Sequence, residues 1–174
     1  MYKIKNLYDN ILPYTDGSAV GLAFANDVSI GNRKMSPSLR IIFKEIEDTI
    51  YGGCMLNQDP TLESWVNQGV LLLNTALTVK KGQPGSHKDL WELLTYKILS
   101  VLNQNRTGII YLLWGKHAQY YAPCINPNNN YILEAPHPAA EIYSPGIGFL
   151  GCKHFVKVNE LIQQSNGDGY AITW

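Results

Sequence analysis

Hydrophobic residues in this 174-residue chain follow a helical spacing in some segments and form short continuous runs in others. The clearest helical pattern covers 37–51, where apolar residues recur on one helix face behind a Ser36-Pro37 start. The longest pattern covers 86–103, and we expect its inner face to carry five residues: Leu90, Leu93, Leu94, Ile98 and Leu102. The same reasoning predicts shorter helices over 62–67 and 116–121, and a closing helix over 153–164.

Continuous apolar runs between these helices predict strands. The runs 70–74 and 109–114 have strand length and are typical of strands that are covered on both faces. Further candidates are 2–11 and 131–134. Because strands alternate with helices, we predict an α/β protein with three α/β/α layers and a central, largely parallel four-stranded sheet. We expect residues 1–174 to form a single domain.

The overall composition fits a folded protein without a membrane span. The 14 basic and 14 acidic side chains balance, so phosphate contacts would have to come from local groups and not from net charge. The apolar runs are too short to cross a bilayer, and the N-terminus lacks a signal-peptide pattern. Cys54, Cys124 and Cys152 have no paired spacing, which disfavours a disulfide framework and a CxxC metal site. We therefore expect an intracellular protein, cytoplasmic or nuclear (or in the host cytoplasm if viral), with no metal or cofactor.

Four segments carry the candidate chemistry. They are Pro13-Tyr14 followed by Gly-Leu-Ala-Phe at 21–24, Gly-Val-Leu-Leu-Leu-Asn-Thr-Ala-Leu-Thr at 69–78, Ala-Pro-His-Pro at 135–138, and a tail that begins Gly-Cys-Lys-His-Phe at 151. The segments fall at the ends of expected strands, where ligands bind in parallel α/β sheets. Together they resemble uracil-DNA glycosylases of the common, metal-free family, over nearly the whole chain.

The resemblance implies a pocket that selects uracil. Tyr14 would exclude the methyl group of thymine, and uracil would stack on Phe24. Asn74 would donate to O4 and accept from N3–H, a pattern that cytosine reverses. His137, mounted between two prolines, would donate from a neutral imidazole to O2 as negative charge builds on the departing base. Each residue also has a structural explanation: a packed turn for Tyr14, a core position for Phe24, a surface or core position for His137, and turn capping for Asn74.

The resemblance also implies loops that grip DNA. Ser36 and Ser38 match a proline-containing loop that compresses the phosphate backbone, and Lys116 replaces a family serine in a second loop. In the best-known members the loop after the histidine reads Pro-Ser-Pro-Leu, and its leucine wedges into the duplex. Here it reads Pro-Ala-Ala-Glu-Ile-Tyr, so Ile142 or Tyr143 is expected in that role, while Glu141 would repel phosphate.

The family's catalytic carboxylate is missing from this sequence. Its motif Gly-Gln-Asp-Pro-Tyr contains the Asp that polarises the attacking water, but the matching register reads Asn-Ile-Leu-Pro-Tyr, with Leu12 in place of the Asp. Asp9 or Asp16 are alternatives, although a strand would point Asp9 to the opposite face and Asp16 has the setting of a turn. Gln58-Asp59-Pro60 repeats three letters of this motif, but we interpret Asp59 as part of the turn that starts the helix predicted from residue 62. A positioned general base raises the reaction rate by about 10²- to 10⁴-fold, so without the carboxylate we expect slow excision.

The sequence therefore leaves several interpretations open. The first is a uracil-DNA glycosylase, shortened at its N-terminus and attenuated by Leu12, that hydrolyses the N-glycosidic bond of deoxyuridine in DNA. The second is a non-catalytic uracil- or DNA-binding homologue that acts as a reader, decoy or assembly subunit. A third is an inert paralogue or a glycosylase for another modified base. We expect a monomer that binds uracil-containing DNA, single-stranded at least, and leave a protein partner open.

Overall fold

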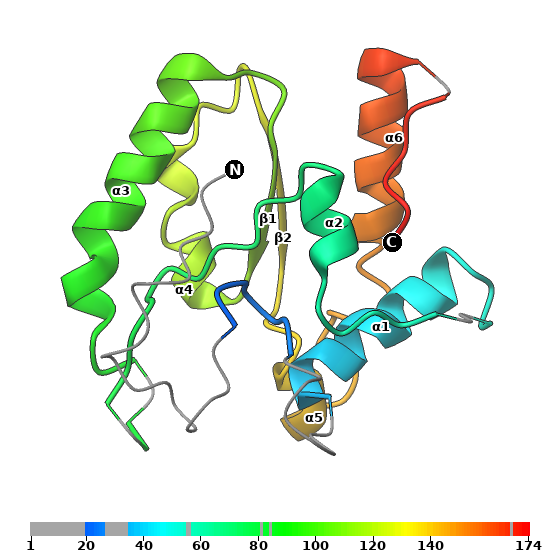
Figure 1. Ribbon diagram of the computed structural model, residues 1–174, viewed down its shortest axis with the longest axis horizontal. Helices are drawn as coiled ribbons and strands as arrows, with labels where there is room; N and C mark the ends of the chain where they lie inside the picture. The colour runs from blue at the N-terminus through cyan, green and yellow to red at the C-terminus, as the bar shows by residue number, and fades with distance from the viewer. Residues whose placement is uncertain (1–19, 27–34, 55–56, 81, 84, 168) are drawn as a thin grey trace. The chain divides into compact units, whose positions relative to one another are not determined.

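The computed structural model describes residues 20–26, 35–54, 57–80, 82–83, 85–167 and 169–174 (Figure 1). The chain is divided into two compact units. The first unit contains the described residues of Met1–Ser36 and Asp59–Ile98, and the second contains those of Pro37–Gln58 and Leu99–Trp174. The single domain over residues 1–174 stays a prediction. None of the described helices is both long enough and apolar enough to cross a membrane.

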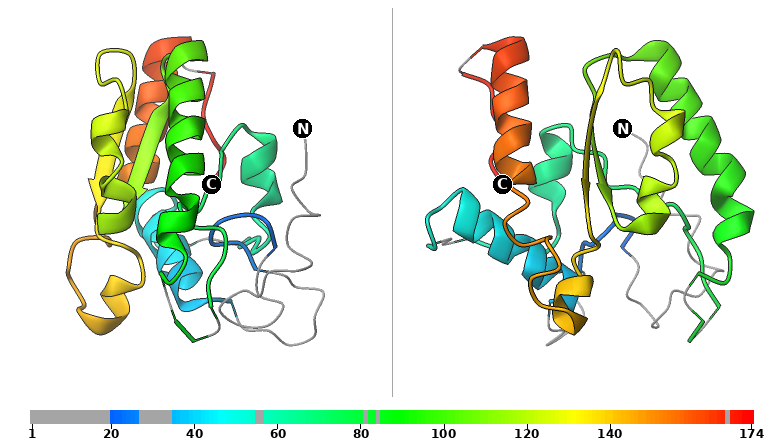
Figure 2. Two further views of the ribbon diagram at one scale, coloured as in Figure 1. Left: turned by 90° about the vertical axis from the view of Figure 1, so that its left-hand side faces the viewer. Right: turned by 180° about the vertical axis from the view of Figure 1, so that it is seen from behind.

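The second unit contains a parallel strand pair. Strand β1 (Ile110–Trp114) pairs with β2 (Tyr131–Ala135) in a register that puts Ile110 opposite Tyr131 and Trp114 opposite Ala135. The connection between the strands contains helix α4 (Lys116–Gln119) and the short η1 (Ala122–Cys124). Figures 1 and 2 show α4 on one side of the strand pair and α6 (His154–Asn166) on the other. The predicted helices over 116–121 and 153–164 and the strands over 109–114 and 131–134 are confirmed within a few residues.

Helix α1 (Pro37–Thr49) supplies much of the core of the second unit. Its predicted apolar face is confirmed, because Leu39, Ile42, Phe43 and Ile46 are all buried. Burying each of these side chains stabilises the fold by roughly 1.5–3 kcal/mol. Helix α1 contacts α6, so the two helices join the start and the end of this unit.

Aromatic side chains tie the C-terminus to this core. The Trp114 ring meets Phe149 edge-on at a centroid distance of 5.0 Å, and Phe155 meets Trp174 at 4.9 Å. The indole of Trp174 donates to the carbonyl oxygen of Phe155 at 3.2 Å, and the Tyr51 hydroxyl donates to the carbonyl oxygen of Trp174 at 2.8 Å. Edge-to-face pairs of this kind add about 0.5–1.5 kcal/mol beyond their area burial.

In the first unit, the short helix α2 (Glu63–Asn67) confirms the helix predicted over 62–67, and Gly69 follows it at φ 94°. The prediction of a buried strand over 70–74 is wrong. Among the described residues the sheet has two strands, 70–74 pairs with neither, and Leu71 is 65% exposed. The candidate strand over 2–11 lies outside the described residues, so the four-stranded sheet is not confirmed.

Helix α3 (Lys88–Asn105) confirms the helix predicted over 86–103 but not its inner face. Leu90 and Leu93 are 73% and 80% exposed, whereas Thr95 and Leu99 are buried. The Thr95 hydroxyl has hydrogen-bond geometry to the carbonyl oxygens of both Thr75 and Trp91 at 3.2 Å. Polar contacts of the helix with the 75–78 segment therefore decide which face turns inwards, and the leucine spacing does not.

Candidate functional site

His137 follows the end of β2, and the backbone fixes its tautomer. The N–H of Ala139 donates to Nδ1 of His137 at 3.1 Å, so the neutral ring carries its proton on Nε2. The side chain reaches solvent, while the protein packed around the rest of the ring lowers the pKa of His137 by desolvation. The result is a neutral N–H donor near pH 7, which suits an oxygen that gains negative charge.

Gly115 lets the end of β1 approach this histidine closely. A Cβ atom at position 115 would lie 2.9 Å from the Cβ of His137, and the φ of 86° disfavours any other residue. The N–H of Gly115 also donates to the carbonyl oxygen of Ala135 at 2.9 Å. Lys116 is the next residue and is exposed at the start of α4. The structure therefore places Lys116 next in the chain to the glycine that packs against His137.

The loop after His137 presents two of the predicted DNA-contacting residues. In helix α5 (Ala140–Tyr143), Ile142 is 44% exposed and Tyr143 is 84% exposed. Glu141 between Ala140 and Ile142 is only 4% exposed. The expectation that Glu141 would repel phosphate is wrong, because its carboxylate binds backbone N–H groups of its own loop.

Those N–H groups also set the charge state of Glu141. Oε1 accepts hydrogen bonds from the N–H groups of Gly148, Phe149 and Leu150 at 2.7–3.0 Å, and Oε2 accepts one from Gly146 at 2.8 Å. Burial opposes ionisation, but the four hydrogen bonds together outweigh it and lower the pKa of Glu141. The carboxylate is therefore ionised at neutral pH.

In the first unit, Phe24 has an unusual backbone conformation. Its φ is +66°, which is a strained value for a bulky side chain and is typical of positions that function constrains. The preceding residue, Ala23, donates its N–H to the carbonyl oxygen of Leu72 at 3.3 Å. The structure therefore brings the Phe24 turn beside the segment that leads to Asn74. Asn74 itself is exposed, which corrects the expectation of an amide at the end of a buried strand.

The remaining predicted residues have mixed outcomes. Ser36 is half-buried, and its N–H donates to Oδ1 of Asn26 at 3.1 Å. Ser38 is half-buried in the first turn of α1. Leu12 and Tyr14 lie outside the described residues. The roles of these residues in binding stay predictions.

Sequence reasoning missed two buried polar groups of the second unit. Glu45, 1% exposed on α1, accepts hydrogen bonds from the N–H groups of Gly151 and Lys153. The available signal was its position three residues after Ile42, which places both side chains on the same side of the helix. His154, 2% exposed, accepts at Nδ1 from the Trp114 indole at 3.0 Å, and burial lowers its pKa to about 4.

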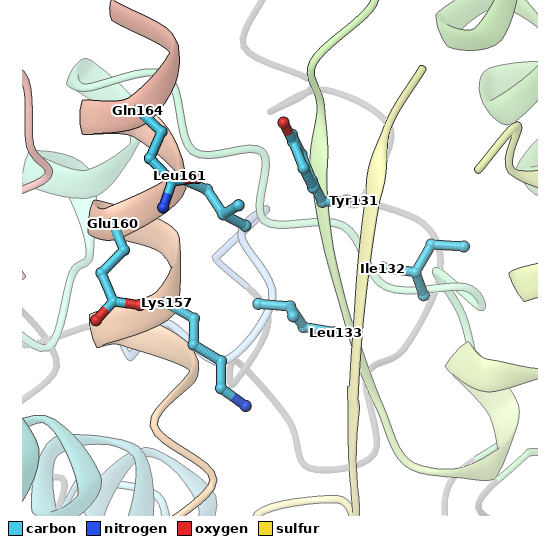
Figure 3. A pocket seen from close by; sticks show the side chains of 7 residues that line it. All are labelled: Tyr131, Ile132, Leu133, Lys157, Glu160, Leu161 and Gln164. Atoms are coloured by element: carbon cyan, nitrogen blue, oxygen red, sulfur yellow. The ribbon is translucent and has the colours of Figure 1, made fainter. Parts of the chain in front are cut away.

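A separate hollow lies between β2 and α6 (Figure 3). Its volume is about 250 Å³, and Tyr131 and Leu133 point from β2 towards α6, while Ile132 points to the other side of the strand. None of the predicted site residues lines it. Within the described ranges, no three His, Cys, Asp or Glu side chains come close enough together to hold a metal ion.

The motif residues and the geometry around His137 agree with comparisons to known proteins. A family model described as the uracil DNA glycosylase superfamily matches residues 11–163. The chain belongs to this superfamily. The uracil-DNA glycosylase of Escherichia coli K12 is 46% identical to it over 149 residues, which cover 85% of the chain and 62% of the relative. The protein of Escherichia coli O81 (strain ED1a) is 47% identical with the same coverage. The chain thus spans less than two thirds of the length of these relatives.

Solved structures support the same assignment of the fold. The crystal structure of mimivirus uracil-DNA glycosylase matches with a TM-score of 0.78 at 24% identity, covering 90% of this superfamily member and 60% of the mimivirus chain. A variant of mimivirus UNG in complex with UGI matches with a TM-score of 0.77 at 24% identity, covering 90% and 61%. The uracil-DNA glycosylase resemblance predicted from the motifs is confirmed, and the fold is of that type.

Proposed function

We propose that this chain binds uracil-containing DNA and hydrolyses the N-glycosidic bond of deoxyuridine, at a rate reduced by the leucine at position 12. The observation that carries the proposal is the hydrogen bond from the Ala139 N–H to Nδ1 of His137, which leaves the ring proton on Nε2. Superfamily membership supplies the reaction type, and the neutral donor is the group that this reaction needs at the leaving base.

In the proposed reaction, the bond between C1′ of the sugar and N1 of uracil breaks, and its electron pair moves onto the base. The Nε2–H of His137 donates to O2, where the charge collects. Water then adds to C1′ and loses a proton to solvent, and the uracil anion takes up a proton, which yields an abasic site and free uracil. Phe24 would stack on the base and Asn74 would pair with its O4 and N3–H; the exposure of Asn74 leaves its amide accessible for that contact.

Leu12 decides how fast water attacks. A carboxylate at this position would orient and polarise water, and such a base raises the reaction rate by about 10²- to 10⁴-fold. The test is release of uracil from an end-labelled single-stranded oligonucleotide under excess protein, with Leu12→Asp beside the native chain. We expect slow release by the native chain and at least tenfold faster release by the variant. Equal rates would contradict the alignment of Leu12 with the catalytic carboxylate.

Base selection is tested at Asn74. An ionised aspartate at this position only accepts hydrogen bonds, whereas uracil O4 needs a donor. Asn74→Asp should therefore admit cytosine or abolish uracil binding. Binding of single-stranded oligonucleotides that contain uracil, cytosine or thymine measures this directly. Unchanged uracil affinity in the variant would remove Asn74 from the proposal.

A second candidate function is favoured by Leu12 alone: a non-catalytic protein that binds uracil in DNA. It predicts binding without release in the oligonucleotide experiment, even at long times. We also propose that the chain acts as a monomer inside the cell, in the cytoplasm or nucleus. Light scattering of the purified protein, free and with a uracil-containing oligonucleotide, tests the oligomeric state.

A further inference from the structure

The ends of β1 and β2 determine where the His137 ring lies. His137 is the second residue after β2, and Gly115 is the first residue after β1. The two approach so closely that a Cβ atom at position 115 would lie 2.9 Å from the Cβ of His137. The imidazole therefore keeps its place only while the two strand ends keep theirs. A shift of one end against the other would move the Nε2 proton relative to a bound base.

One side chain of α4 links both strand ends. The Nε2 amide of Gln119 donates to the carbonyl oxygen of Ala135 at 2.9 Å and to that of Leu113 at 3.5 Å. The Gly115 N–H donates to the same Ala135 oxygen at 2.9 Å, so two donors meet at the carbonyl that lies two residues before His137. The main-chain N–H of Gln119 also donates to the carbonyl oxygen of Gly115 at 3.0 Å. Gln119 thus joins the segment of Gly115 to the segment of His137.

The opposite face of the strand pair carries a second link between the same ends. His154 of α6 accepts the Trp114 indole N–H at Nδ1 and is also hydrogen-bonded to the backbone of Glu134. Figures 1 and 2 show α4 and α6 on the two sides of the strands. Because His154 is buried in the core, its loss would disturb packing as well, whereas the half-buried Gln119 can be changed with less effect on the core.

We propose that Gln119 is a positioning residue for His137: by donating to carbonyl oxygens at the ends of both strands, it keeps the Nε2–H of the histidine where O2 of the departing uracil needs a donor. The inference rests on the proposed function. A donor that is fixed beforehand stabilises developing charge, and a displacement of about 1 Å in such a group costs on the order of 10²-fold in rate. The proposal predicts slower chemistry with unchanged binding of DNA.

The other ends of the same strands provide a matched control. Asn130, directly before β2, is 7% exposed; it accepts the Ile109 N–H at 3.0 Å and donates to the carbonyl oxygen of Asn126 at 3.1 Å. Like Gln119, it is a carboxamide that joins the two strand segments. It lies where the parallel strands begin, whereas His137 follows where they end. If both carboxamides only stabilised the fold, their loss would have the same kind of effect.

The experiment measures uracil release from a single-stranded oligonucleotide under saturating protein, and the affinity for the same oligonucleotide, in the full chain with Leu12 and with Leu12→Asp. Gln119→Met keeps the side-chain length and removes the donor. We expect the release rate at saturation to fall by about tenfold, because the Gly115 N–H still holds part of the geometry, and the affinity to stay the same. Gln119→Glu, which keeps the shape but cannot donate when ionised, should reproduce the loss.

Two control variants separate positioning from stability. Asn130→Leu should lower the urea midpoint at least as much as Gln119→Met does, but leave the release rate of the folded protein unchanged. Gln104→Met, at an exposed position of α3, should change neither quantity. If Asn130→Leu does not fold, Asn130→Asp takes its place, because it retains the acceptor for the Ile109 N–H and removes only the donor.

NMR spectra of the nitrogen-labelled protein follow the imidazole without any reaction. The Nδ1 resonance of His137 and the amide resonance of Ala139 report on the hydrogen bond between these groups. Both should shift in Gln119→Met and stay in place in the Asn130 variant. A parent-like release rate in Gln119→Met, an equal loss of rate in the Asn130 variant, or unchanged resonances in Gln119→Met would each overturn the inference.

Failure of the proposed function gives a different result. The parent protein would then release no uracil with either residue at position 12, and it would not prefer uracil in the single strand. The comparison of the His137 and Ala139 resonances would still decide whether Gln119 positions the histidine, because it requires no reaction.

Discussion

The second unit holds His137 through a backbone hydrogen bond and a close approach of Gly115, whereas in the first unit Phe24 is half-buried and Asn74 is exposed. Nδ1 of His137 accepts the Ala139 N–H, and Gly115 packs against its Cβ. In the first unit, a backbone hydrogen bond from Ala23 to Leu72 joins the two segments that carry Phe24 and Asn74. One unit is thus built around a fixed donor, and the other around accessible groups.

Under the proposed function, this difference between the units corresponds to two separate tasks. A donor that is fixed before the reaction stabilises developing charge without further reorganisation, and this contributes to the rate. An exposed amide and a half-buried aromatic ring contribute to selection once a base is present and water is displaced. Changes in the second unit should therefore affect stability and rate, while changes in the first should affect base selection with smaller effects on stability.

The largest expected effect is on stability, in Glu45→Ala. The substitution removes the acceptor of the Gly151 and Lys153 N–H groups, and hydrogen bonds to a carboxylate contribute roughly 1.5–3 kcal/mol each, so we expect a loss of about 4 kcal/mol. Urea unfolding measures it. Asp48→Ala on the same helix removes only an exposed ion pair with Lys44 and should leave the urea midpoint almost unchanged. Similar losses in both variants would mean that the loop is not anchored by Glu45.

The next effect is a pH dependence caused by His154. Burial lowers its pKa from 6.5 to about 4, so between these values the unfolded chain binds a proton that the folded chain does not. Stability is therefore complete above about pH 6.5 and falls as the pH drops towards 4, by on the order of 3 kcal/mol. The lowered pKa of His137 acts in the same direction.

Urea midpoints between pH 7.5 and 4.5 test this prediction. His154→Asn should flatten the curve, although the variant itself will be less stable at neutral pH because the Trp114 indole loses its partner. His117→Gln, at an exposed position of α4, should leave the slope as it is. A slope that persists undiminished in His154→Asn would assign the pH dependence to another group.

Gly115→Ala should disturb the fixed donor directly. The added methyl group would lie 2.9 Å from the Cβ of His137, and a displacement of the order of 1 Å in such a group costs about 10²-fold in rate, equivalent to about 2.7 kcal/mol. Uracil release in the Leu12→Asp background measures the effect. Gly108→Ala is a matched control, because Gly108 has a similar φ of 74° but no atom within 4 Å of the place that its new methyl group would take. Equal losses would attribute the effect to backbone strain alone.

The smallest effect is expected in the first unit, from Thr78→Val. The Thr78 hydroxyl accepts from the Trp91 indole at 2.7 Å and lies 3.0 Å from Nδ1 of His87. Because this cluster is only half-buried, we expect a loss of about 1 kcal/mol in urea unfolding. Thr107→Val, at an exposed position, should be close to neutral. A loss as large as that of Glu45→Ala would remove the proposed contrast between the units.

The sequence predicted those parts of the fold that depend on spacing alone. Helix α1 has one apolar stripe and no competing face, so its start and its buried apolar residues followed from the pattern, although it ends at Thr49 and not at 51 and also buries Glu45. In α3, leucines occur on more than one side, and the hydrogen bonds of Thr95 and Trp91 decide the inner face. The 70–74 run illustrates a further limit, because an apolar run specifies burial only when a partner strand pairs with it.

In the candidate site, too, the sequence pattern predicted some features, while others depend on contacts within the fold. The motif was enough to select His137 as the histidine of interest, but its tautomer depends on one backbone N–H that no pattern reveals. Glu141 was predicted to face phosphate because it follows the histidine motif closely. Its real direction is set by amides five to nine residues further along the chain, in a loop without periodicity.

The amides that bind Glu141 and Glu45 should also be visible in hydrogen–deuterium exchange. Irregular segments usually exchange within the time needed to mix the sample, because their N–H groups face water. The N–H groups of Phe149 and Gly151 are instead held by carboxylates, so they exchange only when the loop opens. A short island of slow exchange between α5 and α6 would then mark the loop as part of the folding core of the second unit.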